Sequence, residues 1–274
     1  MTTESGDYVL GTQDAEVARL GLQHRVWRDS MLSAWRSAGL RPGWRVIDVG
    51  AGPGYATTDL AEAVGPSGRV LAVERSTRFV QLIEATARER RLTQVQAMAA
   101  DLMVAPAPPG NDMVWCRWVA SFVPSVTALV DWIHDALRSG GVAVFHEYVD
   151  YASWQFAPAR PHLREFVLEV MASWRAAGGE PDVAASLIAA LNQSGFRLTS
   201  VRPLVFAARP GELMWQWPAR FVATNVERLC ALGRVSDAWA QNVIRELQLA
   251  EQDPESVVVT PMVLELIALR DPTG

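Results

Sequence analysis

The stretch from Val46 to Gly54 reads VIDVGAGPG, a short apolar run that ends in a loop with glycine at every second position. A short apolar run bounded by glycines is typical of a buried strand. Glycines also let the main chain approach a bound molecule without Cβ atoms in the way. In an open α/β sheet, ligands bind at the carboxyl ends of the strands, where the strand order reverses. The run therefore predicts the first strand of such a sheet, with a ligand bound at its end.

Two kinds of ligand suit a loop in this position, a dinucleotide and S-adenosylmethionine. A dinucleotide loop has the pattern G-x-G-x-x-G, and counted from Gly50 its third glycine falls on Tyr55. Asp48 lies two residues before Gly50, where a carboxylate repels a pyrophosphate but accepts hydrogen bonds from an ammonium group or from water. Both features favour S-adenosylmethionine.

The next apolar run, from Arg69 to Glu74, ends in an acid about where a ribose diol would lie. The carboxylate of Glu74 can accept hydrogen bonds from both ribose hydroxyls. An acid at this point would suit a nicotinamide dinucleotide equally well. The distinction between the two ligands therefore depends on the glycine loop and on Asp48.

With these motifs the chain resembles the class I S-adenosylmethionine-dependent methyltransferases, and within them the small-molecule branch. The resemblance covers roughly residues 40 to 200 and returns near the C-terminus. Five motifs follow one another in the order of that family: Val46–Gly54, Val70–Glu74, Ala99–Leu102, Asn111–Trp118 and Leu137–Val144. The last of them resembles a helix end, a glycine turn and a strand. Two departures are mild, because Ala51 stands where many members have Cys or Ser, and Glu74 stands where Asp is frequent.

The resemblance implies S-adenosylmethionine as the cofactor and suggests which residues bind it. Glu74 matches the acid that binds the ribose, and Asp101 matches the acid that meets the adenine amino group. Arg117 ends the motif that passes under the methionine part, so it is a candidate partner of the methionine carboxylate. The predicted cofactor residues are Asp48, Gly50, Ala51, Gly52, Gly54, Glu74, Arg75, Asp101, Leu102 and Arg117.

These residues also have structural alternatives. The glycines would suit an ordinary strand-to-helix turn, and Glu74 and Asp101 could be acids at helix N-termini. Arg117 could cap the end of a strand instead of binding a carboxylate. Asp48 is better interpreted as a residue that supports the cofactor-binding residues than as one that contacts the cofactor itself.

Composition removes several other classes of function. The net charge of −5 over 274 residues disfavours a protein that grips a phosphate backbone. All 25 basic residues are arginine, and without a lysine amine the chain cannot be a Schiff-base, pyridoxal-phosphate or P-loop enzyme. Two cysteines make no disulfide framework, and no run reaches the ~18 apolar residues of a membrane span. We therefore expect a cytoplasmic protein with neither nucleic acid nor membrane as a partner.

Strand and helix patterns alternate along the chain, which predicts an α/β fold with a doubly wound, Rossmann-like sheet. Together with the resemblance, they predict a seven-stranded methyltransferase sheet, mostly parallel with an antiparallel last strand, and helical lid insertions. The expected division is an N-terminal segment of two helices in 1–40, core in 41–150, a lid insertion in 151–180, core in 181–206, a second lid insertion in 207–255 and a last strand in 256–274. Residues 204–208 are an alternative last strand, which would leave the C-terminus helical.

Five of the 11 tryptophans fall in the two predicted lid insertions: Trp154, Trp174, Trp215, Trp217 and Trp239. Tryptophans in amphipathic helices generally pack in a core, but with five in the lid we expect some to face the pocket. A lid of this kind excludes water from the reacting groups. It favours a small apolar acceptor, aromatic or polyketide-like, as the partner, with O-methylation ahead of C- or N-methylation.

Methyl transfer from a sulfonium depends mainly on alignment, and a base is needed only where the nucleophile must lose a proton. His146 lies near the end of the predicted fifth strand, at the edge where acceptors bind, and is the first candidate for a general base. Its alternative is a strand histidine with a satisfied hydrogen bond. Glu147 and Tyr151 are rivals or orienting groups. His24 in the N-terminal segment is the second histidine to test, with half-burial against the sheet as its alternative.

Other functions and partners stay open. A protein or tRNA methyltransferase would need a basic or elongated groove, which the acidic balance disfavours. A non-methylating member would keep the cofactor pocket and lose in-line access to the methyl group. The four histidines are scattered and show no ligand spacing, so we expect no metal. A homodimer is compatible with the sequence.

Overall fold

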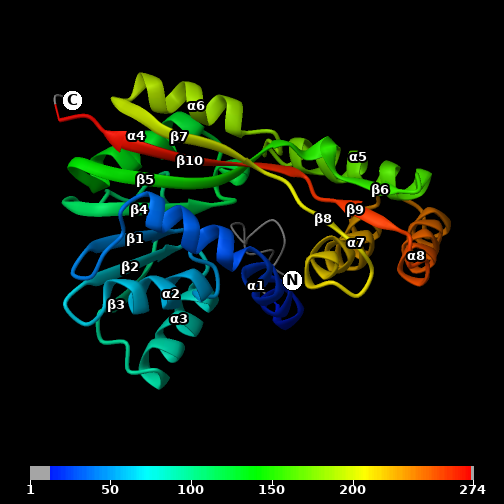
Figure 1. The fold of residues 1–274 in the computed structure, drawn as a ribbon, viewed down its shortest axis with the longest axis horizontal. Helices are drawn as coiled ribbons and strands as arrows, with labels where there is room; N and C mark the ends of the chain where they lie inside the picture. The colour runs from blue at the N-terminus through cyan, green and yellow to red at the C-terminus, as the bar shows by residue number, and fades with distance from the viewer. Residues whose placement is uncertain (1–12, 273–274) are drawn as a thin grey trace.

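A seven-stranded sheet forms the centre of the computed structural model, which describes residues 13–272 (Figure 1). Its strands are β1 (Arg45–Val49), β2 (Arg69–Glu74), β3 (Val95–Ala99), β4 (Asn111–Arg117), β5 (Leu137–Asp150), β7 (Phe196–Leu204) and β10 (Met262–Arg270). They lie in the order β3-β2-β1-β4-β5-β10-β7. Strands β1 to β5 pair in parallel, whereas β10 is antiparallel to both of its neighbours. The predicted fold class, with its antiparallel last strand, is confirmed.

Helices cover both faces of this sheet because successive strand residues point to opposite faces. The helices are α1 (Asp14–Ser37), α2 (Tyr55–Val64), α3 (Thr77–Glu89), α4 (Val126–Ala136), α5 (Pro161–Ala176), α6 (Ala184–Gln193), α7 (Leu213–Ala231) and α8 (Asp237–Gln252). Within β1, Val46 packs with α1 and α2 on one face, and Ile47 packs with α4 and α6 on the other. The strand that leads into the glycine loop is therefore held from both sides.

In the described residues 13–40 the N-terminal segment contains one helix, whereas two are predicted for the whole of 1–40. The structure has one helix of 24 residues, α1, whose buried Trp27, Met31 and Trp35 recur at helical spacing. Gly21 lies inside this helix, and a Cβ there would lie 2.9 Å from the hydroxyl oxygen of Tyr55. The glycine thus allows α1 to pass close to the start of α2. The first 12 residues of the predicted segment lie outside the described residues.

The segments predicted to form the lid, called the lid below, contain strands as well as the predicted helices. Figure 1 shows α5, α7 and α8 gathered at one end of the molecule with a small antiparallel sheet of β6 (Gln155–Ala157), β9 (Val257–Val259) and β8 (Ala207–Ala208). The single last strand expected in 256–274 is divided at Thr260 and Pro261, since proline has no N–H for a ladder hydrogen bond. Only β10 joins the main sheet, and residues 273–274 lie outside the described part.

A row of three polar side chains crosses the main sheet. His146 in β5 faces Glu265 in β10, and Glu265 faces Arg202 in β7. His146 Nε2 lies 3.2 Å from Glu265 Oε2, and Arg202 Nη2 donates to the same oxygen at 2.9 Å. His146 and Glu265 are 0% and 1% exposed. The row links the antiparallel strand to both of its neighbours.

Replacing Glu265 by alanine is expected to lower the free energy of unfolding by about 2 to 3 kcal/mol. The substitution leaves a cavity and removes the acceptor of both His146 and Arg202. Glu265→Gln retains the volume and one carbonyl oxygen, so it should cost about 1 kcal/mol. Urea unfolding followed by circular dichroism measures both values, and wild-type stability in Glu265→Ala would contradict a structural role for the row.

Candidate functional site

A cavity of about 320 Å³ lies where β1, β2 and β4 end, a volume within the range of small-molecule sites. The predicted site residues that line it are His24, Asp48, Gly50, Ala51, Gly52, Glu74, Arg75, Asp101, Leu102 and Arg117. Gly54, His146, Glu147 and Tyr151 do not line it. The structure thus brings together nearly all of the predicted cofactor residues but only one of the predicted catalytic residues.

The glycine loop after β1 depends on backbone conformations that favour glycine. Gly50, Gly52 and Gly54 have φ values of 62°, 56° and 87°, all in the left-handed region. A Cβ on Gly50 would lie 2.4 Å from Cγ2 of Val119, and one on Gly54 would lie 2.6 Å from Cγ1 of Ile83. Gly50 and Gly52 line the cavity, whereas Gly54 is packed against α3 and caps α2.

Glu74 joins the end of β2 to the glycine loop. The main-chain N–H of Gly52 donates to Glu74 Oε2 at 2.9 Å, and the N–H of Ser76 donates to Oε1 at 2.8 Å. Each carboxylate oxygen has a second lone pair that stays available. Glu74 is half-buried at the cavity wall. The carboxylate is therefore held in place by the main chain and can still accept hydrogen bonds from a ligand.

The cavity end beside β3 combines an apolar wall with one exposed acid. Phe79, Leu102 and Met103 supply the apolar side chains. Asp101 is exposed, and its Oδ1 accepts the N–H of Met103 at 2.9 Å. A flat apolar group with a hydrogen-bond donor on its edge would fit such a wall.

Asp48 lies at the floor of the cavity, 2% exposed. Its Oδ2 accepts the hydroxyl of Thr57 in α2 at 2.6 Å. Burial raises the pKa of Asp48 to about 7, although the Thr57 bond and the charge of Arg117 oppose the rise. Asp48 thus ties β1 to α2 beneath the glycine loop.

Arg117 brings a positive charge into the opposite end of the cavity. Its guanidinium carbon lies 5.7 Å from the ring centre of Trp115 and 5.1 Å from that of Trp118, both within cation–π distance. Burial lowers the pKa of Arg117 to about 10, so the group stays charged at neutral pH. Its polar side-chain contacts within residues 13–272 are with Met31 and His24 in α1.

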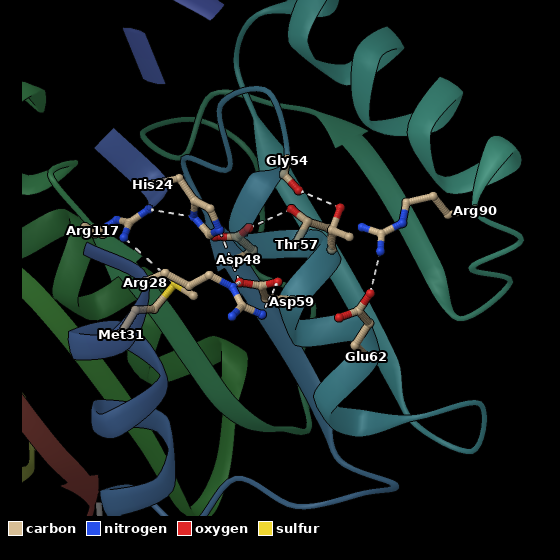
Figure 2. A network of polar contacts seen from close by, with 11 residues as sticks. His24, Arg28, Met31, Asp48, Gly54, Thr57, Asp59, Glu62, Arg90 and Arg117 are labelled. Atoms are coloured by element: carbon tan, nitrogen blue, oxygen red, sulfur yellow. Dashed lines mark hydrogen bonds and ion pairs between the residues drawn. The ribbon is translucent and has the colours of Figure 1, made fainter. Parts of the chain in front are cut away.

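His24 lies in a polar network that joins α1 to α2 (Figure 2). His24 Nε2 lies 3.1 Å from Asp59 Oδ2, and Arg28 donates to both Asp59 oxygens at 2.7 and 3.1 Å. Because a carboxylate only accepts, Nε2 carries the ring proton and Nδ1 is the basic nitrogen. Nδ1 lies 3.4 Å from Nη2 of Arg117, at the long end of hydrogen bonding.

Burial lowers the pKa of His24 below its ordinary value of 6.5, even though the hydrogen bond with Asp59 raises it. The positive charge of Arg117 acts in the same direction as burial. His24 is 7% exposed and lines the cavity. It therefore presents a neutral imidazole to a ligand at neutral pH.

The other three predicted catalytic residues do not line the cavity themselves and have structural contacts. His146 belongs to the row across the sheet described above. Glu147 accepts the N–H groups of Val119 and Ala120 at 2.7 and 2.9 Å, and burial raises its pKa to about 7. Tyr151 begins the 3₁₀ turn η2 (Tyr151–Ser153) and is 2% exposed. The expected position of these three residues at the acceptor side of the cavity is therefore not found.

His146 and Glu147 nonetheless shape the cavity rim through the main chain. Trp118 has a φ of 55°, a left-handed conformation that is rare for a bulky residue. Its N–H donates to the carbonyl of His146 at 3.0 Å, and Glu147 holds the next two N–H groups. Together they turn the chain after β4 so that Trp118, Val119 and Phe122 line the cavity.

Several lining residues were not predicted from sequence: Leu20, Gln23, Tyr55, Phe79, Met103, Trp118, Val119 and Phe122. Trp118 closes the fourth motif, which was a usable signal. Tyr55 and Phe79 begin helices that follow predicted strands. Leu20 and Gln23 belong to α1, which no motif connects to the cavity. Only their spacing with His24 on one helix indicates that the three could share a surface.

The lid tryptophans do not line this cavity, contrary to the expectation that some would. Trp154, Trp174, Trp215 and Trp217 are between 1% and 4% exposed within the lid core, and Trp239 packs against that core. Their rings meet Phe166, Phe221 and other aromatic rings edge to face, a stable arrangement. The lid therefore uses its tryptophans mainly for its own packing.

Residues 13–272 contain no candidate metal centre and no candidate membrane-spanning helix. No three His, Cys, Asp or Glu side chains there are grouped so that they could hold a metal ion. None of the helices in that range combines the length and the apolar character needed to cross a membrane.

Comparison with known proteins agrees with this fold and cavity. Residues 46–141 match a family model described as a methyltransferase domain. Demethylmenaquinone methyltransferase of Lactococcus lactis subsp. lactis (strain IL1403) is 27% identical over 123 residues, which are 44% of this chain and 48% of the relative. The same enzyme of Geobacillus sp. (strain WCH70) is 28% identical, over 44% of this chain and 51% of the relative. The chain spans about half the length of these curated relatives.

Solved structures share the fold across most of the chain. Geranyl diphosphate C-methyltransferase from Streptomyces coelicolor A3(2) has a TM-score of 0.56 at 14% identity, covering 90% of this chain and 81% of that one. YcgJ from Bacillus subtilis has a TM-score of 0.59 at 14% identity, covering 89% and 99%. The [4+2]-cyclase SpnF has a TM-score of 0.53 at 18% identity, covering 88% and 80%. At these identities the likeness concerns the fold alone.

The sheet order and the cavity at the strand ends define a Rossmann-like domain with a ligand site at its switch point. The match of residues 46–141 to a methyltransferase domain agrees with the class I resemblance that the motifs carry, and S-adenosylmethionine is the cofactor that this resemblance implies.

Proposed function

We propose that this protein transfers a methyl group from S-adenosylmethionine to a small organic acceptor. One observation carries the proposal: a single cavity holds a carboxylate at the end of β2, an acid after β3 and a guanidinium at the end of β4, around a bare glycine loop. These groups match, in order, the ribose, the adenine and the methionine carboxylate of the cofactor. The relatives named as demethylmenaquinone methyltransferases support a small-molecule acceptor.

The cofactor would lie along the ends of the strands. Glu74 would accept the ribose hydroxyls, while Asp101 would accept the adenine amino group beside the apolar wall of Leu102. Gly50, Ala51 and Gly52 would form the floor under the nucleoside, with Arg75 at the exposed edge. Arg117 would pair with the methionine carboxylate. Asp48 would support the glycine loop through its hydrogen bond with Thr57, without contacting the cofactor directly. Bound there, the cofactor supplies an activated methyl group.

The acceptor would lie against the wall formed by α1 and the turn after β4. Leu20, Trp118, Val119 and Phe122 make this wall apolar, which favours an aromatic or polyketide-like acceptor. Among the histidines in the described residues, only His24 lines the cavity. We assign His24 the role of proton acceptor, in place of His146, because its Asp59 bond leaves Nδ1 as the basic nitrogen. Such a base favours O-methylation of a hydroxyl.

Methyl transfer should therefore depend on pH through His24. The neutral ring is the active form, so the rate should rise as pH increases through the pKa of His24 and level off above it. Because burial lowers that pKa below 6.5, the acid limb of kcat against pH should lie below pH 6.5. Asp59→Asn should move the limb further toward acid, since the Asp59 bond raises the pKa of His24. A limb above 6.5, or one that Asp59→Asn does not move, would contradict the assignment.

A second candidate function is a reaction other than methyl transfer, because a [4+2]-cyclase shares the fold. A fold does not determine its reaction, and a non-methylating protein would still bind the cofactor. Incubation with methyl-labelled S-adenosylmethionine and a panel of phenols, hydroquinones and polyketides separates the two functions. Label on an acceptor supports methyl transfer, whereas tight cofactor binding with no label on the whole panel favours the non-methylating alternative.

A further inference from the structure

One polar side chain on the acceptor wall has no part in the function proposed above. Gln23 lies in α1 beside His24 and lines the cavity half-buried. Its Oε1 accepts two hydrogen bonds at 3.0 Å, one from Nη1 of Arg19 and one from Nε1 of Trp217. Gln23 thus connects α1 to the lid helix α7.

The two donors determine which end of the amide is free. An arginine guanidinium and an indole N–H donate hydrogen bonds and cannot accept them, so the amide oxygen must be the atom that faces both. The NH₂ group is then the only polar group that Gln23 can offer to the cavity. No partner is recorded for it within residues 13–272.

The surroundings hold Gln23 in this orientation. Arg19 is 4% exposed and is itself paired with Glu16 by two bonds of 2.7 Å. Trp217 is 4% exposed and stacks on Trp118, with ring centres 5.9 Å apart and planes 20° apart. Two buried side chains on different helices therefore fix the amide. A donor held this way costs little further entropy when a ligand binds it.

Apart from His24, the lining residues of α1 and of the turn after β4 that neighbour Gln23 are apolar. Leu20 precedes Gln23 by one helical turn, and Trp118 and Val119 face the cavity from the turn after β4. A hydrogen-bond donor in such a wall discriminates between ligands that have an acceptor atom there and ligands that lack one, because an unpaired polar group is costly in an apolar site.

We infer that the Gln23 NH₂ group donates a hydrogen bond to an oxygen of the methyl acceptor, and so selects acceptors that carry a carbonyl or other accepting oxygen on an apolar frame. The inference rests on the proposed function, since it assumes that the acceptor lies against α1. It makes Gln23 a specificity-determining residue with no role in the cofactor contacts.

Gln23→Glu is a matched test of this inference. A carboxylate at position 23 still accepts from Arg19 and Trp217, so the link between α1 and α7 persists, but the group offered to the cavity changes from a donor to an acceptor. The probes are α-tetralone and tetralin, which differ by one carbonyl oxygen. Calorimetry with protein saturated with S-adenosylhomocysteine measures the affinity for each probe, and circular dichroism verifies that the variant is folded.

The wild type should bind α-tetralone about fivefold or more tightly than tetralin, and Gln23→Glu should lose that preference while its affinity for S-adenosylhomocysteine stays unchanged. The inference is overturned if the wild type shows no preference, including no binding of either probe, or if the variant keeps it. A weaker affinity of Gln23→Glu for S-adenosylhomocysteine with the tetralone preference intact would assign Gln23 to the cofactor and also overturn it. Failure of the wild type to bind S-adenosylhomocysteine contradicts the proposed function itself, so the two failures are distinct.

Discussion

Glu74→Ala is expected to weaken binding of S-adenosylmethionine by about 100-fold, or ~2.7 kcal/mol. The substitution removes the carboxylate that would accept both ribose hydroxyls, and hydrogen bonds to charged groups contribute about 1.5 to 3 kcal/mol each. It also releases the N–H of Gly52, which Glu74 holds at 2.9 Å, so the glycine loop loses part of its support. Isothermal titration calorimetry with S-adenosylhomocysteine, the demethylated product, measures the effect without turnover.

Two further variants serve as controls for the effect of Glu74→Ala on affinity. Glu74→Gln keeps the volume and one accepting oxygen, so it should bind about tenfold more weakly than the wild type. Glu62→Ala removes an acid from α2 that pairs with Arg90 at 2.6 Å, outside the cavity (Figure 2), and should leave the affinity unchanged. Wild-type affinity in Glu74→Ala would show that the ribose does not lie at the end of β2.

His24→Asn should slow methyl transfer by about 10² to 10⁴-fold, the usual contribution of a general base. Asparagine can still donate to Asp59, so the link between α1 and α2 should persist, but the basic nitrogen is lost. The affinity for S-adenosylhomocysteine should change little, because the cofactor contacts lie with Glu74, Asp101 and Arg117. Single-turnover kinetics with an acceptor identified from the labelled panel measures the chemical step.

His146→Ala provides the matched control for a histidine outside the cavity. It should retain the rate and the cofactor affinity while losing stability, since His146 is wholly buried and bonded to Glu265. If His24→Asn turns over as fast as the wild type and His146→Ala is the inactive variant, the assignment of the proton acceptor is wrong. Wild-type activity in both variants would mean that the reaction needs neither of these two histidines.

The sheet and the cofactor end of the cavity were predictable because their signals are local in sequence. The run from Val46 to Gly54 contains the strand, the turn and the glycines, and left-handed φ values at all three glycines follow from that pattern. Glu74 and Asp101 are each the first acid after a strand or at its end, and parallel strands bring their carboxyl ends to one edge. Local motifs, together with the family resemblance that they carry, were therefore enough.

The acceptor side was not predictable because its contacts join distant parts of the chain. His146 was placed at the correct edge of the sheet, but its partner Glu265 lies 119 residues away. Trp217 reaches Gln23 across 194 residues. The spacing of residues near His146 or Gln23 in the sequence does not indicate either of these partners. The lid tryptophans show the same limit, since helical periodicity indicates a buried face without saying what covers it.

Local sequence patterns also gave wrong predictions for where some helices and strands begin and end. The chain from Leu137 to Val144 was expected to hold a helix end, a glycine turn and a strand, but all of it belongs to β5, and α4 already ends at Ala136. One last strand was expected in 256–274. The structure instead has two strands in different sheets, because Val257–Val259 pairs with β6 and β8.

Calorimetric titration of the full chain with S-adenosylhomocysteine, and in parallel with NAD, tests most directly whether the S-adenosyl nucleoside occupies the cavity at the strand ends. We expect saturable one-to-one binding of S-adenosylhomocysteine that Glu74→Ala weakens, and no heat of binding from NAD. Tight uptake of NAD with no uptake of S-adenosylhomocysteine would contradict the cofactor assignment and, with it, methyl transfer.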